Sequence, residues 1–96
     1  MATPEGRVKE RVKKELAKAK AYYHMPVQNG MGCPSLDFIG CHLGRFFGIE
    51  TKAGKKGPTP RQQITMAGME LAGGKAFLIN DETGLDELRA WLSAYK

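Results

Sequence analysis

Residues 46–62, FFGIETKAGKKGPTPRQ, run from an apolar strand pattern into charged residues and then into a loop containing Gly and Lys. Side chains alternate between the two faces of a strand, so Glu50 and Lys52 project side by side from one face. The opposite face carries the apolar side chains of Phe47 and Ile49. A carboxylate and an ammonium at the end of an apolar strand indicate either a solvated ion pair or a chemical site.

The segment before this strand carries a second carboxylate. Residues 36–43 (LDFIGCHL) and 45–52 (RFFGIETK) are separated by a short connection, which predicts a hairpin. In that hairpin, Asp37 approaches Glu50 at the open end of the sheet. Two converging carboxylates repel each other, and a divalent cation that prefers hard oxygen ligands, Mg²⁺ or Mn²⁺, relieves the repulsion. For an isolated E-x-K motif, an ion pair between Glu50 and Lys52 is the simpler interpretation.

Helical patterns flank the hairpin. Thr3 and Pro4 have the residue types of a helix start, and on this first helix Glu5 falls on the apolar side. We therefore expect Glu5 to point inward or toward a cleft. After the basic loop, Thr59 caps a second helix and Gln62 occupies the capping-box position. The expected buried stripe of this helix consists of Ile64, Ala67, Gly68 and Leu71.

The remaining segments complete an α/β pattern. Residues 21–28 (AYYHMPVQ) and 75–80 (KAFLIN) are typical of short strands, and residues 83–95 of a closing helix. The order α-β-β-β-α-β-α predicts a small mixed sheet flanked by helices. The length of 96 residues predicts a single domain over residues 1–96.

The composition narrows the functional classes. The formal net charge of +5 suits a polyanionic partner such as nucleic acid, or an anionic membrane surface. No apolar run is long enough for a transmembrane helix, and the charged N-terminus lacks the apolar core of a secretion signal, so we expect a cytoplasmic protein. Cys33 and Cys41 form neither a disulfide framework nor the spacing of a zinc site.

The segments GCPSLDFIG and GRFFGIETKAGKKGPTPRQ resemble the virus-type replication-repair nuclease (VRR-NUC) domain. This family belongs to the PD-(D/E)xK superfamily of restriction-endonuclease-like nucleases and is common in bacteriophages. The resemblance covers most of the chain, from Pro4 to the closing helix. One departure is that Pro34 is separated from Asp37 by two residues, whereas the family often has Pro directly before the aspartate.

The resemblance implies a role for each matching residue. Asp37 and Glu50 match the acidic metal ligands, and Lys52 matches the motif lysine. Gln62 matches the downstream glutamine, and Glu5 matches the glutamate of the first helix. Both of the last two also have structural explanations, because Gln62 suits a capping box and Glu5 complements a helix dipole.

The implied site holds Mg²⁺ or Mn²⁺ on Asp37, Glu50 and the Thr51 carbonyl, with Glu5 contributing directly or through water. Lys52 would orient the attacking water or stabilise charge on the phosphate. The flanking basic residues, which we expect to bind DNA phosphates, are Lys55, Lys56 and Arg61.

The function implied by the resemblance is metal-dependent endonuclease cleavage of branched DNA by a homodimer, as in a Holliday-junction resolvase. A two-fold dimer presents two sites, which suits two paired nicks across a four-way junction. The alternatives are a flap or nicking nuclease, and a non-catalytic basic module that binds nucleic acid. A phage-encoded protein would act in the cytoplasm of the host cell.

Overall fold

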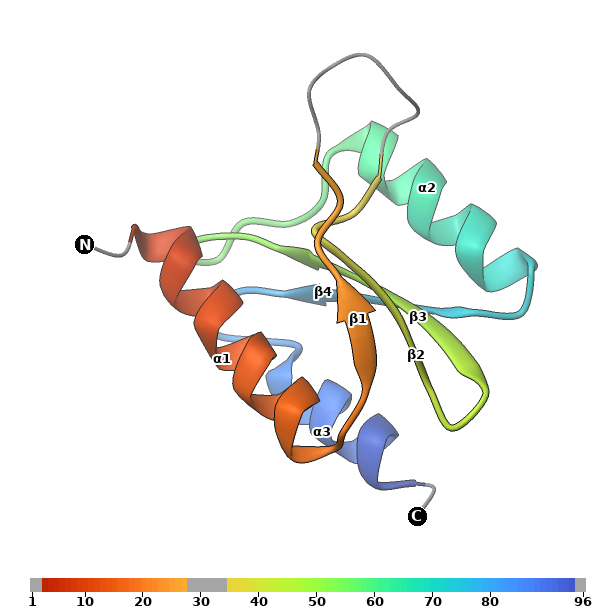
Figure 1. Cartoon of the computed structure of the whole chain (residues 1–96). Helices are drawn as coiled ribbons and strands as arrows, with labels where there is room; N and C mark the ends of the chain where they lie inside the picture. The colour runs from red at the N-terminus through yellow and green to blue at the C-terminus, as the bar shows by residue number, and fades with distance from the viewer. Residues whose placement is uncertain (1–2, 28–34, 95–96) are drawn as a thin grey trace.

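The computed structural model, which describes residues 3–27 and 35–94, has the element order expected from the sequence (Figure 1). Four strands form one sheet, and helices lie on both of its faces. None of the helices in the described ranges is long and apolar enough to cross a membrane. The elements are α1 (Pro4–Lys18), β1 (Tyr22–His24), β2 (Phe38–His42), β3 (Arg45–Thr51), α2 (Pro60–Leu71), β4 (Lys75–Ile79) and α3 (Leu85–Ser93).

The strands lie in the order β1-β2-β3-β4, with antiparallel pairs up to β3 and a parallel β3–β4 pair. The predicted β2–β3 hairpin is confirmed. Leu43 and Gly44 in its turn have φ angles of 53° and 82°, and two successive positive φ angles are the requirement of a tight I′ hairpin turn. Phe38 pairs with Ile49 in this hairpin. One step further out, Asp37 therefore lies opposite Glu50.

One face of the sheet carries the hydrophobic core. Phe47 and Ile49 point toward α1 and α3, as their alternation on β3 predicts. The expected start of α1 is also confirmed, because the Gly6 N–H donates to Thr3 Oγ1 at 2.9 Å and Pro4 follows the cap. The fully buried residues that α1 and α3 contribute to this core are Val8, Val12, Leu16 and Leu88.

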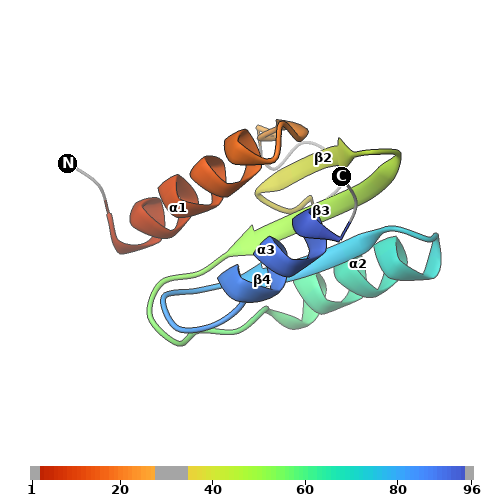
Figure 2. The ribbon, with the colours of Figure 1, turned by 90° about the horizontal axis from the view of Figure 1, so that it is seen from below.

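The other face is covered by α2, on the opposite side of the strands from α1 (Figure 2). The predicted buried stripe of α2 is wrong, because that side of the helix faces solvent and the opposite side faces the sheet. Ile64 is 74% exposed and Leu71 is 91% exposed, and no residue of α2 is fully buried. The partly buried residues are on the opposite side of the helix, and they are Gln62, Thr65, Met66 and Met69.

The phase of α2 is set by contacts with β3 rather than by hydropathy. Gln62 bonds to Glu50, and Met69 packs over Gly48, where an added Cβ would lie 2.6 Å from the Met69 sulfur. A glycine at this position is therefore what allows the helix to approach the strand. The more apolar stripe of α2 is left facing outward.

Two further expectations differ or fall outside the described ranges. The first strand is shorter than predicted, spanning Tyr22–His24 instead of residues 21–28. Residue 28 at the end of the predicted first strand, Cys33, Pro34, and Tyr95 at the end of the predicted closing helix lie outside the described residues.

Candidate active site

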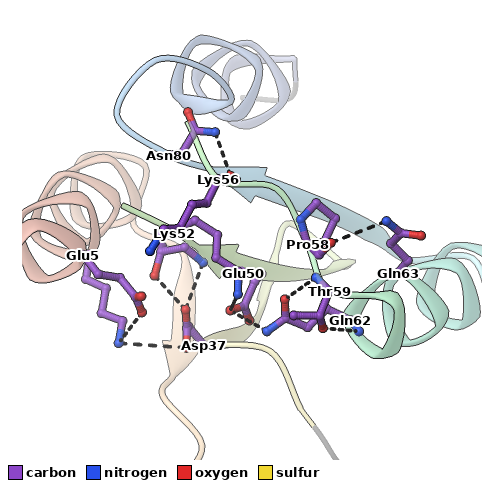
Figure 3. A network of polar contacts seen from close by, with 12 residues as sticks. Glu5, Asp37, Glu50, Lys52, Lys56, Pro58, Thr59, Gln62, Gln63 and Asn80 are labelled. Carbon is purple, nitrogen blue, oxygen red and sulfur yellow. Dashed lines mark hydrogen bonds and ion pairs between the residues drawn. The ribbon is translucent and has the colours of Figure 1, made fainter. Parts of the chain in front are cut away.

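Polar residues from the end of β3, from the segment before β2 and from the first turns of α1 and α2 meet near the end of β3 (Figure 3). Glu50 and Thr51 close this strand, and Lys52 follows it. Asp37 comes from the residue before β2, and Glu5 from the first turn of α1. The hairpin register and the entry of α1 therefore bring together residues that are 32 and 45 positions apart, counted from Glu5 to Asp37 and to Glu50.

Asp37 is anchored by the strand next to it. Its Oδ2 accepts hydrogen bonds from the Thr51 backbone N–H at 2.9 Å and from the Thr51 hydroxyl at 2.7 Å. Thr51 is fully buried, so it holds this carboxylate at the end of the sheet. One carboxylate oxygen is thereby used for positioning, and Oδ1 remains on the side of α1.

Glu50 is a buried carboxylate with one oxygen satisfied and one not. Its Oε2 accepts a hydrogen bond from Gln62 Nε2 at 3.0 Å and lies 3.7 Å from Lys52 Nζ. Its Oε1 is buried with no hydrogen-bond partner among the described residues. An unpaired buried oxygen is costly, and such groups in native proteins commonly mark a function or a bound ion.

The environment of Glu50 disfavours its charge. Burial and the neighbouring charge of Asp37 raise the pKa of the Glu50 carboxyl from its usual 4.5 to about 7, against the attraction of Lys52. Glu5 adds a smaller repulsion in the same direction. The site therefore has an excess of negative charge that a cation would relieve.

Gln62 is both a helix cap and a site residue. Its Oε1 accepts from the Thr59 backbone N–H at 3.0 Å, while its own N–H donates to Thr59 Oγ1 at 3.2 Å, so the predicted capping box is confirmed. Because the cap uses the amide oxygen, the amide NH₂ is left to face Glu50. The structural and functional interpretations of this residue are thus compatible.

Glu5 borders the site from α1, as expected, but its carboxylate is engaged by a lysine. Lys9 Nζ lies 3.4 Å from Glu5 Oε2 and 3.9 Å from Asp37 Oδ1 (Figure 3). Sequence reasoning did not include Lys9 in the site. Its spacing of four residues from Glu5 was the available signal, because residues i and i+4 lie on the same helix face.

The carboxylate oxygens present are the ligands that a hard divalent cation prefers, but they do not form a complete set of ligands around one point. Within the described ranges, no group of three His, Cys, Asp or Glu side chains is arranged to hold a metal ion. The features that suit a cation are the paired carboxylates of Asp37 and Glu50 and the unpartnered Glu50 oxygen. Glu5 is held by Lys9 instead.

The basic loop, residues 52–59, connects β3 to α2, and residues 54–57 and 59 of it are exposed. Lys55 and Lys56 lie on it and Arg61 lies just beyond it, all exposed to solvent as phosphate contacts require. Lys55 Nζ is 3.9 Å from Glu82, an exposed pair of little energetic weight.

Two polar residues after β4 hold the basic loop, and sequence reasoning missed both. Asn80 Nδ2 donates to the Lys56 carbonyl at 3.1 Å (Figure 3). The Gly54 N–H donates to Asp81 Oδ2 at 2.7 Å. Asn80 is buried, and its Oδ1 accepts three hydrogen bonds, from the Glu82 N–H and from the N–H and hydroxyl of Thr83. Their position at the end of the predicted strand 75–80 and directly after it was the available signal in the sequence.

Comparison with known proteins bears on the fold. Seven chains of solved structures match the protein. One of them, described as a "VRR_NUC domain", has a TM-score of 0.75 and 18% sequence identity, and the match covers 99% of this chain and 100% of that chain. No protein-family profile matches the sequence, and no curated protein matches it. The chain therefore has the fold of a VRR-NUC domain, and the predicted restriction-endonuclease-like fold class is confirmed.

Proposed function

We propose that the protein is a nuclease of the PD-(D/E)xK type that hydrolyses DNA phosphodiester bonds with Mg²⁺ or Mn²⁺. The observation that carries the proposal is the buried Glu50 carboxylate, which has an unpartnered oxygen and lies beside Asp37 and Lys52. The VRR-NUC fold of the chain supports the same conclusion. An isolated surface ion pair would not need a second carboxylate or a buried oxygen without a partner.

The residues that would hold the metal are Asp37, Glu50 and the Thr51 carbonyl, with Glu5 contributing directly or through water. A divalent cation held by these groups would supply Lewis-acid chemistry, which polarises a phosphate and lowers the pKa of a water molecule. Binding on the Glu5 side requires the Lys9 ammonium to move away, since it now bridges Glu5 and Asp37.

The chain's own groups supply orientation and charge. Lys52, with its ammonium 3.7 Å from Glu50, is the residue we assign to the water or to the negative charge that develops on the phosphate. Gln62 holds the Glu50 carboxylate in place through a hydrogen bond fixed by the helix cap. Lys55, Lys56 and Arg61 are the proposed phosphate contacts, which give affinity with little sequence information.

The substrate we propose is branched DNA, in particular a four-way junction cut by a homodimer. A domain of 96 residues has little surface for reading sequence, whereas DNA shape can be recognised through phosphates. A flap or nicking nuclease is the alternative within the enzymes, and a basic binding module is the alternative outside them.

The test is cleavage of four-way-junction, flap and linear DNA, each with Mg²⁺, with Mn²⁺ and with chelator. We expect metal-dependent, symmetrically paired nicks in the junction, lost in Lys52→Ala while DNA affinity is retained. Lys18→Ala, at the far end of α1 and 76% exposed in its side chain, is the matched control and should cut normally. One-sided nicks or flap removal would support the other enzyme. Binding without any cutting would leave the basic module.

A further inference from the structure

We propose that the outer face of α2, formed by Ile64, Ala67, Gly68 and Leu71, is a two-fold interface between two copies of this chain. The inference specifies the interface of the proposed homodimer. It rests on the proposed nuclease function only for the reason why two copies would pair. These four residues follow the i, i+3, i+4, i+7 spacing of one helix face, and all four are exposed.

The exposure of this face is unusual for its composition. Ile64 and Leu71 are 74% and 91% exposed on one stripe of a helix whose other side already packs on the sheet (Figure 1). Scattered exposed apolar residues need no explanation, but a contiguous apolar stripe marks an interaction surface. A helix with one covered and one uncovered apolar stripe is suited to lie between a sheet and a partner.

The order of residues on this face suits a second copy as the partner, because the small residues lie at its centre and the large ones at its ends. Ile64 and Leu71 are equally distant from the midpoint between Ala67 and Gly68. If two α2 helices pack antiparallel about a two-fold axis at that midpoint, Ile64 of one copy meets Leu71 of the other. The small residues Ala67 and Gly68 then face each other at the axis, where they allow the helices to approach closely. A two-fold interface must be self-complementary in this way.

Charge favours the same partner. α2 carries only Arg61 and Glu70, which balance, in a chain of net charge +5. α1, in contrast, is rich in lysine, so two copies would repel if they met through that helix. Glu70 lies off the outer face of α2, whereas Arg61 is exposed at the edge of this face, three residues before Ile64. In an antiparallel pair of helices, the two copies of Arg61 lie at opposite ends and do not meet.

The groove beside α2 adds to the surface available for the interface. A helix of 12 residues is about 18 Å long and about 10 Å wide, so one of its faces alone covers much less than the roughly 800 Å² per partner that a stable interface buries. A groove of about 590 Å³ continues from Gly68 to the β2–β3 hairpin, where Phe46 is 44% exposed on its wall. We therefore include Phe46 in the interface.

The interface would relate the two sites by the two-fold axis. Gln62 lies in the first turn of α2 and faces the sheet, away from the proposed contact. Antiparallel packing puts the two first turns at opposite ends of the helix pair, so both sites remain open to DNA. This arrangement suits two nicks made on one branched substrate.

The first test is the molar mass in solution, measured by sedimentation at micromolar concentrations. We expect a dimer for the unaltered chain, and at least about a 30-fold weaker dimer for Ile64→Glu and for Leu71→Glu. Tyr22→Glu, an equally drastic change at a residue that is 72% exposed on β1, should leave the dimer intact. A monomeric unaltered chain, or a dimer unaffected by both glutamates, overturns the proposal.

The second test does not depend on the glutamate variants folding well. In a background with Cys33→Ser and Cys41→Ser, a mixture of Ile64→Cys and Leu71→Cys chains should form an oxidised cross-link between unlike chains. Ile64→Cys alone should not cross-link, because its two copies would lie about 10 Å apart along the helix pair. Cross-linking of the single variant with no gain in the mixture contradicts the predicted register.

Nicking assays on the same variants separate this inference from the proposed function. Monomeric glutamate variants that still make metal-dependent single nicks, but no longer paired ones, support both. A dimer with the expected cross-link that cuts no DNA supports the interface and refutes the nuclease. An unaltered chain that is monomeric and still cuts DNA refutes the interface and supports the nuclease.

Discussion

Replacing Glu50 with glutamine should stabilise the metal-free protein while removing its proposed activity. The glutamine has nearly the same shape as the glutamate and lacks its charge. Its amide oxygen can accept the hydrogen bond that Gln62 now donates to Glu50. Glu50→Gln therefore approximates the protonated carboxyl at every pH.

The magnitude follows from the raised pKa of Glu50. The pKa is 4.5 in an unfolded chain and about 7 in the folded one, so the folded protein holds its proton more tightly between these values. Folding stability due to this group is then complete below pH 4.5 and is lost as pH rises to about 7. At about 1.4 kcal/mol for each pH unit, the loss at pH 8 is on the order of 3 kcal/mol. Because Glu50→Gln carries no charge to bury, its free energy of unfolding at pH 8 should exceed that of the unaltered chain by this amount.

The assay is urea unfolding with chelator present, at a series of pH values from 5 to 8, for the unaltered chain and Glu50→Gln. The difference in free energy of unfolding should be small at the acidic end and grow to about 3 kcal/mol at pH 8. Glu10→Gln, at a side chain that is 60% exposed, is the matched control and should show no such growth. Adding Mn²⁺ should then stabilise the unaltered chain and leave Glu50→Gln unchanged.

Two results would refute the reasoning. The first is an equal stability difference at both ends of the pH range, because the effect would then not come from ionisation. The second is a Glu50→Gln variant that is less stable at pH 8, because the buried charge would then be well compensated without a metal.

Three further predictions concern residues around the site. Lys9→Met should bind Mn²⁺ several-fold more tightly by calorimetry, since an ammonium that competes for Asp37 is removed, whereas Lys13→Met, on the same helix, should leave the affinity unchanged. Gly48→Ala should lower the free energy of unfolding by about 1–3 kcal/mol, because the new methyl group meets the Met69 sulfur. Adding Met69→Ala should restore much of the lost free energy, and additive losses in the double variant would contradict this contact. Asn80→Ala should lower the free energy of unfolding by about 1–3 kcal/mol and speed proteolysis within the basic loop. A loop that is cleaved no faster than in the unaltered chain would disprove this prediction.

Local rules predict the parts of the site that lie within one element. Strand alternation is sufficient to put Glu50 and Lys52 on one face, and the capping box predicts where α2 begins. The hairpin connection predicts that Asp37 approaches Glu50, because the pairing register is set by the turn between their strands.

The rest depends on contacts between distant parts of the chain. Two contacts determine which side of α2 faces the sheet: the hydrogen bond from Gln62 to Glu50, and the packing of the Met69 sulfur on Gly48. The hydropathy of the helix residues predicts neither contact. Asn80 looks like an ordinary turn residue until β4 lies beside β3, where it braces the basic loop. Lys9 resembles its solvated neighbours until Asp37 comes within reach from the hairpin.

The amide of Gln62 ties the stability of a helix terminus to the buried Glu50 carboxylate. Fraying of the first turn of α2 would break both cap hydrogen bonds and release Glu50 in the same event. Amide hydrogen exchange in that turn is therefore a direct report on the order of the proposed metal site. A ligand that immobilises Glu50 should slow exchange there more than in the distant half of the same helix.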